Sequence, residues 1–157
     1  MKCVGARVRS IPFWPRLLGF AGLLPQFANA AVLWLGPEVW HAPALRISVV
    51  YAALILSFLG GMWWGIAAGA PAAERRRTLG WLWIAAVLPS LVALACFVPW
   101  AFGWSWPEPS LIMLGSALLL SLGIDSRLSS LAPRWWMALR VPLSIGLGAA
   151  TYLCAIA

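Results

Sequence analysis

Charged residues are scarce in this 157-residue chain, and acidic residues are the scarcest. Charged residues make up 10% of the sequence, with 4 Asp and Glu beside 11 Lys and Arg. About a quarter of the residues in an ordinary soluble domain are charged. A chain of this size cannot bury 63% hydrophobic residues in one core. The composition therefore excludes a soluble or disordered protein and indicates an integral membrane protein.

Residues that carry chemistry are also few. The one histidine, His41, lies in a connector, and Cys3, Cys96 and Cys154 form no closely spaced pair. Haem ligation, Ser–His catalysis and histidine metal sites each need an imidazole inside the helix bundle. We therefore expect a protein that is not an enzyme, with no catalytic residues, no metal site and no cofactor. Cys96 and Cys154 are expected to be buried thiols, and a disulfide between them is the alternative.

Five apolar segments follow one another along the chain. They cover residues 17–35, 44–70, 79–99, 110–131 and 135–157. A membrane-spanning helix needs about 20 residues, and backbone groups in hydrocarbon must be paired within the segment. The connectors are too short to form a domain. The sequence therefore predicts an all-α bundle of five transmembrane helices in a single membrane domain, residues 1–157.

The basic residues predict the orientation of these helices. If all five segments span the membrane, every Lys and Arg except Arg46 falls on one side. This bias places the N-terminus inside and the C-terminus outside, so the charge is a topology signal rather than a sign of nucleic-acid binding. We expect the inner (cytoplasmic) membrane of a bacterium, or the mitochondrial inner membrane if the source is eukaryotic. The exit at Gly36-Pro37 favours a retained helix over a cleaved signal peptide.

Polar residues interrupt the first segment. Gln26 and Asn29 follow Pro25 within an otherwise apolar run. Amides at this depth hydrogen-bond another helix, or the carbonyl that a proline leaves unpaired. We expect a kink at Pro25 that neighbouring helices stabilise.

Small residues recur every four positions in the second segment. The ridge consists of Ala53, Ser57, Gly61, Gly65 and Gly69. Small residues let helix backbones approach closely in lipid. We therefore predict that this ridge is the packing centre of the bundle. Homodimerisation through the same ridge is possible but not favoured, because helices of the same chain are available first.

Four residues, one of them also in the ridge, form a stripe beside it on an ideal helix. They are Arg46, Tyr51, Ser57 and Trp64. The favoured interpretation is an arginine that snorkels to the headgroups and a tyrosine at the interface. The alternative is that this set lines an outward-facing cavity with an apolar floor.

Asp125 and Arg140 are the charged residues expected at membrane depth. The fourth helix reaches full length only if it includes Asp125, and Arg140 follows the start of the fifth helix. A short connector makes these two helices antiparallel neighbours. We predict an ion pair between them. The alternative places Arg140 on lipid phosphate and Asp125 in a local turn with Arg127.

The stretch Tyr51–Gly65 (YAALILSFLGGMWWG) resembles a family of small bacterial membrane proteins of unknown function related to mitochondrial transmembrane protein 69. Supporting pieces occur in the expected order at Gly22–Pro25, Leu88–Ser90 and Leu139–Leu143. The family pattern has His-Trp-Gly where this chain has Trp63-Trp64-Gly65, so this chain lacks that histidine. The resemblance implies the five-helix fold and no established activity.

Two functions are compatible with these features. The first is a packing or assembly protein of the inner membrane, whose partners are the lipid bilayer and other membrane proteins. The alternative is binding or transport of an apolar small molecule, such as a quinone or a lipid, in a cavity beside the second helix.

Overall fold

Five long apolar helices form the protein, as the sequence predicts. The computed structural model describes residues 10–69, 80–104, 106–128 and 131–157, and every regular element in them is a helix. The elements are α1 (Phe13–Ala21), α2 (Leu24–Leu35), η1 (Glu38–Trp40), α3 (His41–Gly69), α4 (Gly80–Ala95), α5 (Val98–Ala101), α6 (Glu108–Arg127) and α7 (Trp136–Ala155). The stretches long and apolar enough to cross a membrane are Phe13–Leu35, Glu38–Gly69, Gly80–Ala101, Glu108–Arg127 and Trp136–Ala155.

Some predicted boundaries differ from the structure. The first helix begins earlier, at Phe13, because Pro15 is tolerated in a first helical turn. The fourth ends at Arg127 and not at residue 131, and includes Asp125 as expected. Some residues with predicted roles lie outside the described residues. They are the predicted helix ends at 70 and 79, the basic residues at 2, 7, 9 and 75–77, and Cys3.

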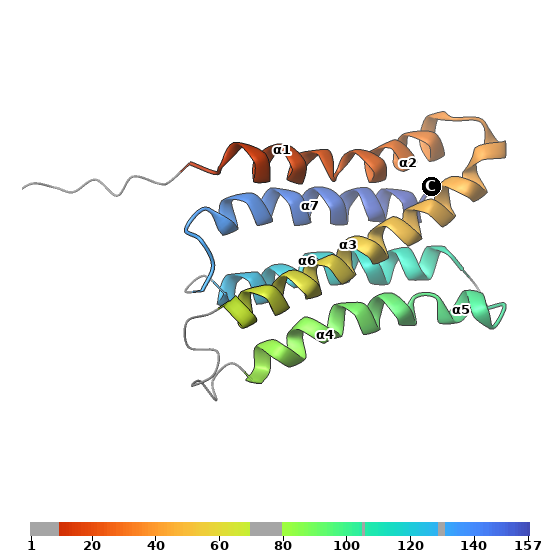
Figure 1. Cartoon of the computed structure of the whole chain (residues 1–157). Helices are drawn as coiled ribbons and strands as arrows, with labels where there is room; N and C mark the ends of the chain where they lie inside the picture. The colour runs from red at the N-terminus through yellow and green to blue at the C-terminus, as the bar shows by residue number, and fades with distance from the viewer. Residues whose placement is uncertain (1–9, 70–79, 105, 129–130) are drawn as a thin grey trace, which may run out of the picture.

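The helices lie side by side and alternate in direction (Figure 1). Helix α7 packs against α6 on one side and α2 on the other, while α3 contacts α2, α4, α6 and α7. One end of the bundle, here called the basic end, holds Arg16, Arg127, Arg134 and Arg140. The C-terminus lies at the opposite end.

The first span is broken where α1 gives way to α2. Gly22 and Leu23 leave the regular helix, and Pro25 occupies the first turn of α2. The hydroxyl of Tyr51 on α3 donates a hydrogen bond to the carbonyl oxygen of Gly22 at this break. A neighbouring helix therefore supplies a donor at the interruption, which lies at Gly22 and Leu23 rather than at Pro25 itself.

The buried face of α3 follows a spacing of three and four residues. Its fully buried apolar side chains include Val49, Ala52, Leu56, Leu59 and Trp63. This spacing matches the 3.6-residue turn, so the face stays turned toward one side of a straight helix. Leu111, Leu114 and Leu118 of α6 are buried in the same core.

The predicted small-residue ridge does not form the packing centre. Residues spaced by four advance about 40° around the helix at each step, and so about 160° from Ala53 to Gly69. Ala53 is buried, whereas Gly61, Gly65 and Gly69 are exposed, and a Cβ atom on any of the three would meet nothing within 4 Å. Residues spaced strictly by four therefore face the core at one end of the segment and turn away from it toward the other end.

Other glycines make the close helix contacts. A Cβ atom on Gly60 would meet the carbonyl oxygen of Ala86 and lie 3.3 Å from Cγ of Pro89, both on α4. Between α6 and α7, a Cβ on Gly148 would lie 2.8 Å from Cδ2 of Leu119 and 3.4 Å from the carbonyl oxygen of Gly115. Gly60 needs glycine because a backbone oxygen approaches it, whereas the atoms closest to Gly148 belong to the Leu119 side chain.

We predict opposite effects for two adjacent substitutions. Gly60→Leu should lower the free energy of unfolding in detergent by about 1–3 kcal/mol, because the backbone carbonyl of Ala86 cannot yield. Gly61→Leu, on the open side of the same helix, is the matched control and should unfold like the parent. Equal losses for the two variants would contradict this assignment of the contact.

Candidate functional site

The four residues predicted to line one cavity lie in separate places. Arg46 and Trp64 are 18 residues apart on α3, or about 27 Å along a straight helix. Arg46 is exposed near Trp100 and Trp104, and the Tyr51 hydroxyl donates a hydrogen bond to the Gly22 carbonyl oxygen. The hydroxyl oxygens of Ser57 and Ser90 are 2.9 Å apart. Trp64 packs edge-on against Trp83, with 4.7 Å between the ring centroids. The alternative that these four residues line one cavity is therefore wrong.

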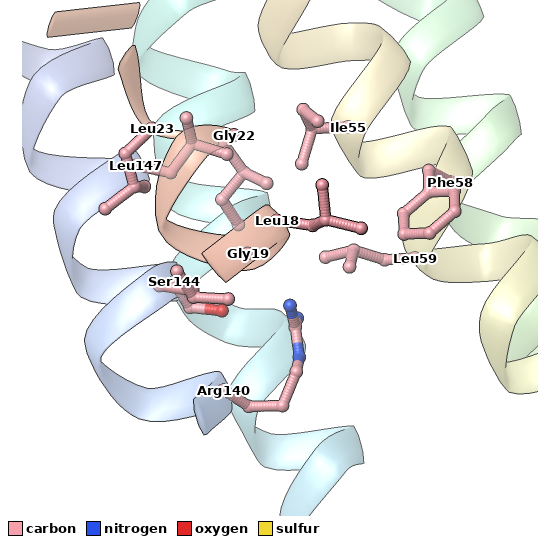
Figure 2. Close-up of a pocket in the computed structure, with 12 residues that line it drawn as sticks. Leu18, Gly19, Gly22, Leu23, Ile55, Phe58, Leu59, Arg140, Ser144 and Leu147 are labelled. Atoms are coloured by element: carbon pink, nitrogen blue, oxygen red, sulfur yellow. The ribbon is translucent and has the colours of Figure 1, made fainter. Parts of the chain in front are cut away.

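A different cavity lies beside α3, between α1, α6 and α7. Its volume is about 140 Å³. Its walls are formed by Leu18, Gly19, Gly22, Leu23, Ile55, Phe58, Leu59, Leu118, Leu143 and Leu147, and its base by Arg140 and Ser144. Figure 2 shows the Arg140 side chain rising toward Leu18 and Leu59 from beneath the cavity.

Glycine keeps part of this space free of side chains. A Cβ atom on Gly19 would lie 2.9 Å from Cδ1 of Leu143. The helix break at Gly22 also belongs to the cavity wall. One side of the cavity is thus formed by glycines at and near the break between α1 and α2.

The polar atoms at the base have no partner among the residues that the structure describes. Nη2 of Arg140 and Oγ of Ser144 are buried and make no hydrogen bond. Both residues belong to α7, one helical turn apart. A buried donor without an acceptor is unfavourable in a lipid environment, so the base of the cavity favours a ligand with an acceptor atom.

Asp125 holds the Arg140 side chain in this position. Nε of Arg140 donates to Oδ2 of Asp125 at 2.8 Å, which is the ion pair predicted from the sequence. The Asp125 side chain is completely buried and Arg140 is only 7% exposed. The two charges neutralise each other away from solvent, as a buried pair requires.

Two tryptophans complete the surroundings of the carboxylate. Nε1 of Trp63 donates to Oδ1 of Asp125 at 2.9 Å, and Nε1 of Trp136 donates to the same oxygen at 3.3 Å. Asp125 thus accepts hydrogen bonds from α3 and twice from α7. We refer to Asp125, Arg140, Trp63 and Trp136 as the Asp125 cluster.

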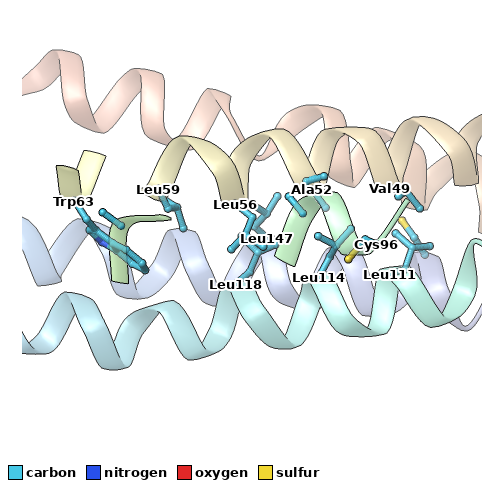
Figure 3. Packing of buried hydrophobic residues seen from close by; sticks show 14 of the residues in the cluster. Val49, Ala52, Leu56, Leu59, Trp63, Cys96, Leu111, Leu114, Leu118 and Leu147 are labelled. Atoms are coloured by element: carbon cyan, nitrogen blue, oxygen red, sulfur yellow. The ribbon is translucent and has the colours of Figure 1, made fainter. Parts of the chain in front are cut away.

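The two tryptophans of this cluster are not among the site residues predicted from the sequence. Trp136 is buried and turned toward Asp125. Trp63 lies on the buried row of α3 (Figure 3), and its place four residues after Leu59 and seven after Leu56 was the signal that could have located it. The indole N–H of Trp63 is the donor that α3 supplies to the carboxylate.

Other predicted polar residues bind across helices. Nε2 of Gln26 on α2 donates to Oγ1 of Thr151 on α7 at 3.0 Å, as expected for an amide at this depth. Cys96 and Cys154 are buried free thiols. Within the four described stretches, no group of three His, Cys, Asp or Glu residues could hold a metal ion.

Breaking the Asp125–Arg140 pair should strongly destabilise the protein. Asp125→Ala and Arg140→Ala should each lower the free energy of unfolding by about 3–5 kcal/mol, because each leaves a buried charge unpaired. The double variant should cost less than the sum of the two. Arg127→Ala, an exposed basic residue near the end of α6, is the control and should change little. Strictly additive losses in detergent unfolding would show that the two residues do not interact.

Comparison with known proteins agrees with the resemblance seen in the sequence. Transmembrane protein 69 of Xenopus tropicalis is 30% identical over 130 residues, which cover 82% of this chain and 48% of the relative. The chain therefore spans about half the length of this curated relative. No solved structure matches the chain. The family described as "Protein of unknown function (DUF3429)" matches residues 11–156, and the chain, a multi-pass membrane protein, belongs to that family.

Proposed function

We propose that this protein binds a lipophilic molecule in the cavity between α1, α3 and α7. One observation carries the proposal. The cavity has apolar walls, and at its base two buried polar groups, on Arg140 and Ser144, have no hydrogen-bond partner in the described part of the chain. Such a combination of apolar surface and a few placed polar groups is typical of small-molecule sites.

The size and position of the cavity suit a ligand that enters from the membrane. An engineered apolar cavity of about 150 Å³ holds benzene, so 140 Å³ accommodates one ring-sized group. Leu18 and Phe58 of the wall are 64% and 65% exposed. The opening between α1 and α3 is therefore apolar and lets a longer tail extend into lipid.

The lining favours binding over catalysis. None of the described residues that line the cavity is a histidine, a cysteine or a carboxylate. The nearby carboxylate of Asp125 already accepts three hydrogen bonds. Few groups remain to transfer a proton, so the proposal is for a binding protein without enzymatic activity.

Assembly with another membrane protein is the second candidate function. Its support is the open face of α3 at Gly61, Gly65 and Gly69, where a partner helix would have room to approach. This candidate would be favoured if native mass spectrometry finds a second protein chain bound to the parent and the Gly61→Leu variant no longer binds it.

Filling the cavity should abolish retention of the ligand. We predict that Ile55→Trp, at a lining position, loses a lipophilic molecule that the parent retains through purification. Leu54→Trp is the matched control, because Leu54 is the adjacent residue and is 62% exposed. Native mass spectrometry with solvent extraction of the gently purified protein measures the retained molecule.

Equal retention by the two variants, or no lipophilic molecule beyond bulk lipid in the parent, would overturn the proposal. If Ile55→Trp does not fold, Leu118→Phe adds bulk from α6 and replaces it. Thermal unfolding of each variant checks the fold before retention is compared.

We also propose the orientation with the basic end in the cytoplasm and the C-terminus outside, in a bacterial inner membrane. Of the basic residues that the structure describes, Arg16, Arg127, Arg134 and Arg140 lie at the basic end and Arg46 does not, and such a bias favours the cytoplasmic side for that end. A periplasm-active reporter fused after Ala157 and a cytoplasm-active reporter fused after Arg77 should both be active in a bacterial host. An inactive C-terminal reporter on an inserted protein would indicate the reverse orientation or four spans.

A further inference from the structure

We propose that the ligand carries a neutral carbonyl oxygen on a ring-sized head, and that this oxygen accepts a hydrogen bond from Nη2 of Arg140. This inference rests on the proposed function, because it names the ligand class for the same cavity.

The donors at the base of the cavity point to an oxygen acceptor. Nε of Arg140 is occupied by Asp125, whereas Nη2 is buried without an acceptor. Oγ of Ser144 lies one turn further along α7 and is also unpartnered. A guanidinium only donates hydrogen bonds, and a serine hydroxyl donates or accepts. A ligand oxygen beside both residues would satisfy the arginine and give the serine a partner.

The charge balance favours a neutral acceptor over an anion. Arg140 is the only charged residue among those that line the cavity, and Asp125 neutralises it. Asp125 cannot turn away readily, because the indoles of Trp63 and Trp136 also bind its carboxylate. An anionic ligand would thus bring an uncompensated negative charge into an apolar site, which is strongly unfavourable. A carbonyl oxygen accepts the hydrogen bond without adding charge.

The shape of the site limits what carries this carbonyl. A volume of 140 Å³ holds a group of about the size of a six-membered ring. The apolar wall extends to Leu18 and Phe58, which face the membrane. Two kinds of molecule share this chemistry: a lipophilic quinone, whose ring bears the carbonyls, and a lipid ester, whose carbonyl is followed by an acyl chain. The ring-sized space favours the quinone.

Four probes of similar tail length separate these possibilities. They are decyl-1,4-benzoquinone, decylbenzene, methyl decanoate and decanoate, each titrated into the purified protein in detergent by calorimetry. We expect the quinone to bind roughly tenfold more tightly than decylbenzene, the usual effect of one hydrogen bond to a charged donor. Methyl decanoate should bind more tightly than decanoate, because decanoate brings a negative charge into the apolar site and the ester does not.

Variants at the base of the cavity test the role of the guanidinium. Arg140→Lys keeps a cation for Asp125 but loses the forked N–H groups, so the quinone should lose its advantage over decylbenzene. Arg134→Lys, an exposed residue outside the cavity, is the matched control and should keep the advantage. If Arg140→Lys does not fold, the comparison of the four probes on the parent still decides.

The outcomes separate this inference from the proposed function. If the quinone and decylbenzene bind the parent equally tightly, and Ile55→Trp abolishes the binding of both, the cavity proposal stands and the carbonyl inference is overturned. Tighter binding of decanoate than of methyl decanoate would replace the neutral ligand with an anion. Tighter binding of methyl decanoate than of the quinone would identify the ester as the source of the carbonyl and overturn the ring-sized head. Failure of all four probes to bind would overturn the proposed function as well.

Discussion

The buried carboxylate of Asp125 determines how α3, α6 and α7 meet at the basic end. It accepts hydrogen bonds from Trp63, Trp136 and Arg140, so one side chain of α6 connects two other helices. A charge at this depth is tolerated only with such complete pairing. The same contacts direct the remaining guanidinium N–H groups of Arg140 away from Asp125. The cavity base is thus a consequence of the ion pair as much as of the apolar walls.

Helix α3 contributes to both the packing and the cavity because its faces differ. One face, at Leu56, Leu59 and Trp63, fills the core between the helices, and Gly60 beside it allows α4 to approach. Ile55 and Phe58 line the cavity, while Gly61 and Gly65 face open space. A rotation of about 100° per residue places these neighbours in different surroundings.

Much of the fold could be predicted from the sequence, because membrane spans need long apolar runs and charged residues there need partners. The five helices and the Asp125–Arg140 pair follow from these two constraints. The ridge prediction failed because a four-residue period drifts around a 3.6-residue helix. The cavity could not be found from α3 alone, since its walls come from four helices and depend on the break at Gly22. Trp63 and Trp136 were missed because their indoles suit the membrane interface equally well.

The Asp125–Arg140 pair also bears on how the chain enters the membrane. Helix α7 is the least hydrophobic of the five spans, with a mean hydropathy of 1.3, and it carries Arg140, Ser144 and Thr151 on its buried side. A lone arginine in a spanning helix opposes insertion by about 2.5–3.5 kcal/mol when it lies at the centre. Asp125 precedes Arg140 in synthesis and belongs to the adjacent helix. Insertion of α6 and α7 together as a hairpin, with their charges already paired, is therefore more favourable than insertion of α7 alone.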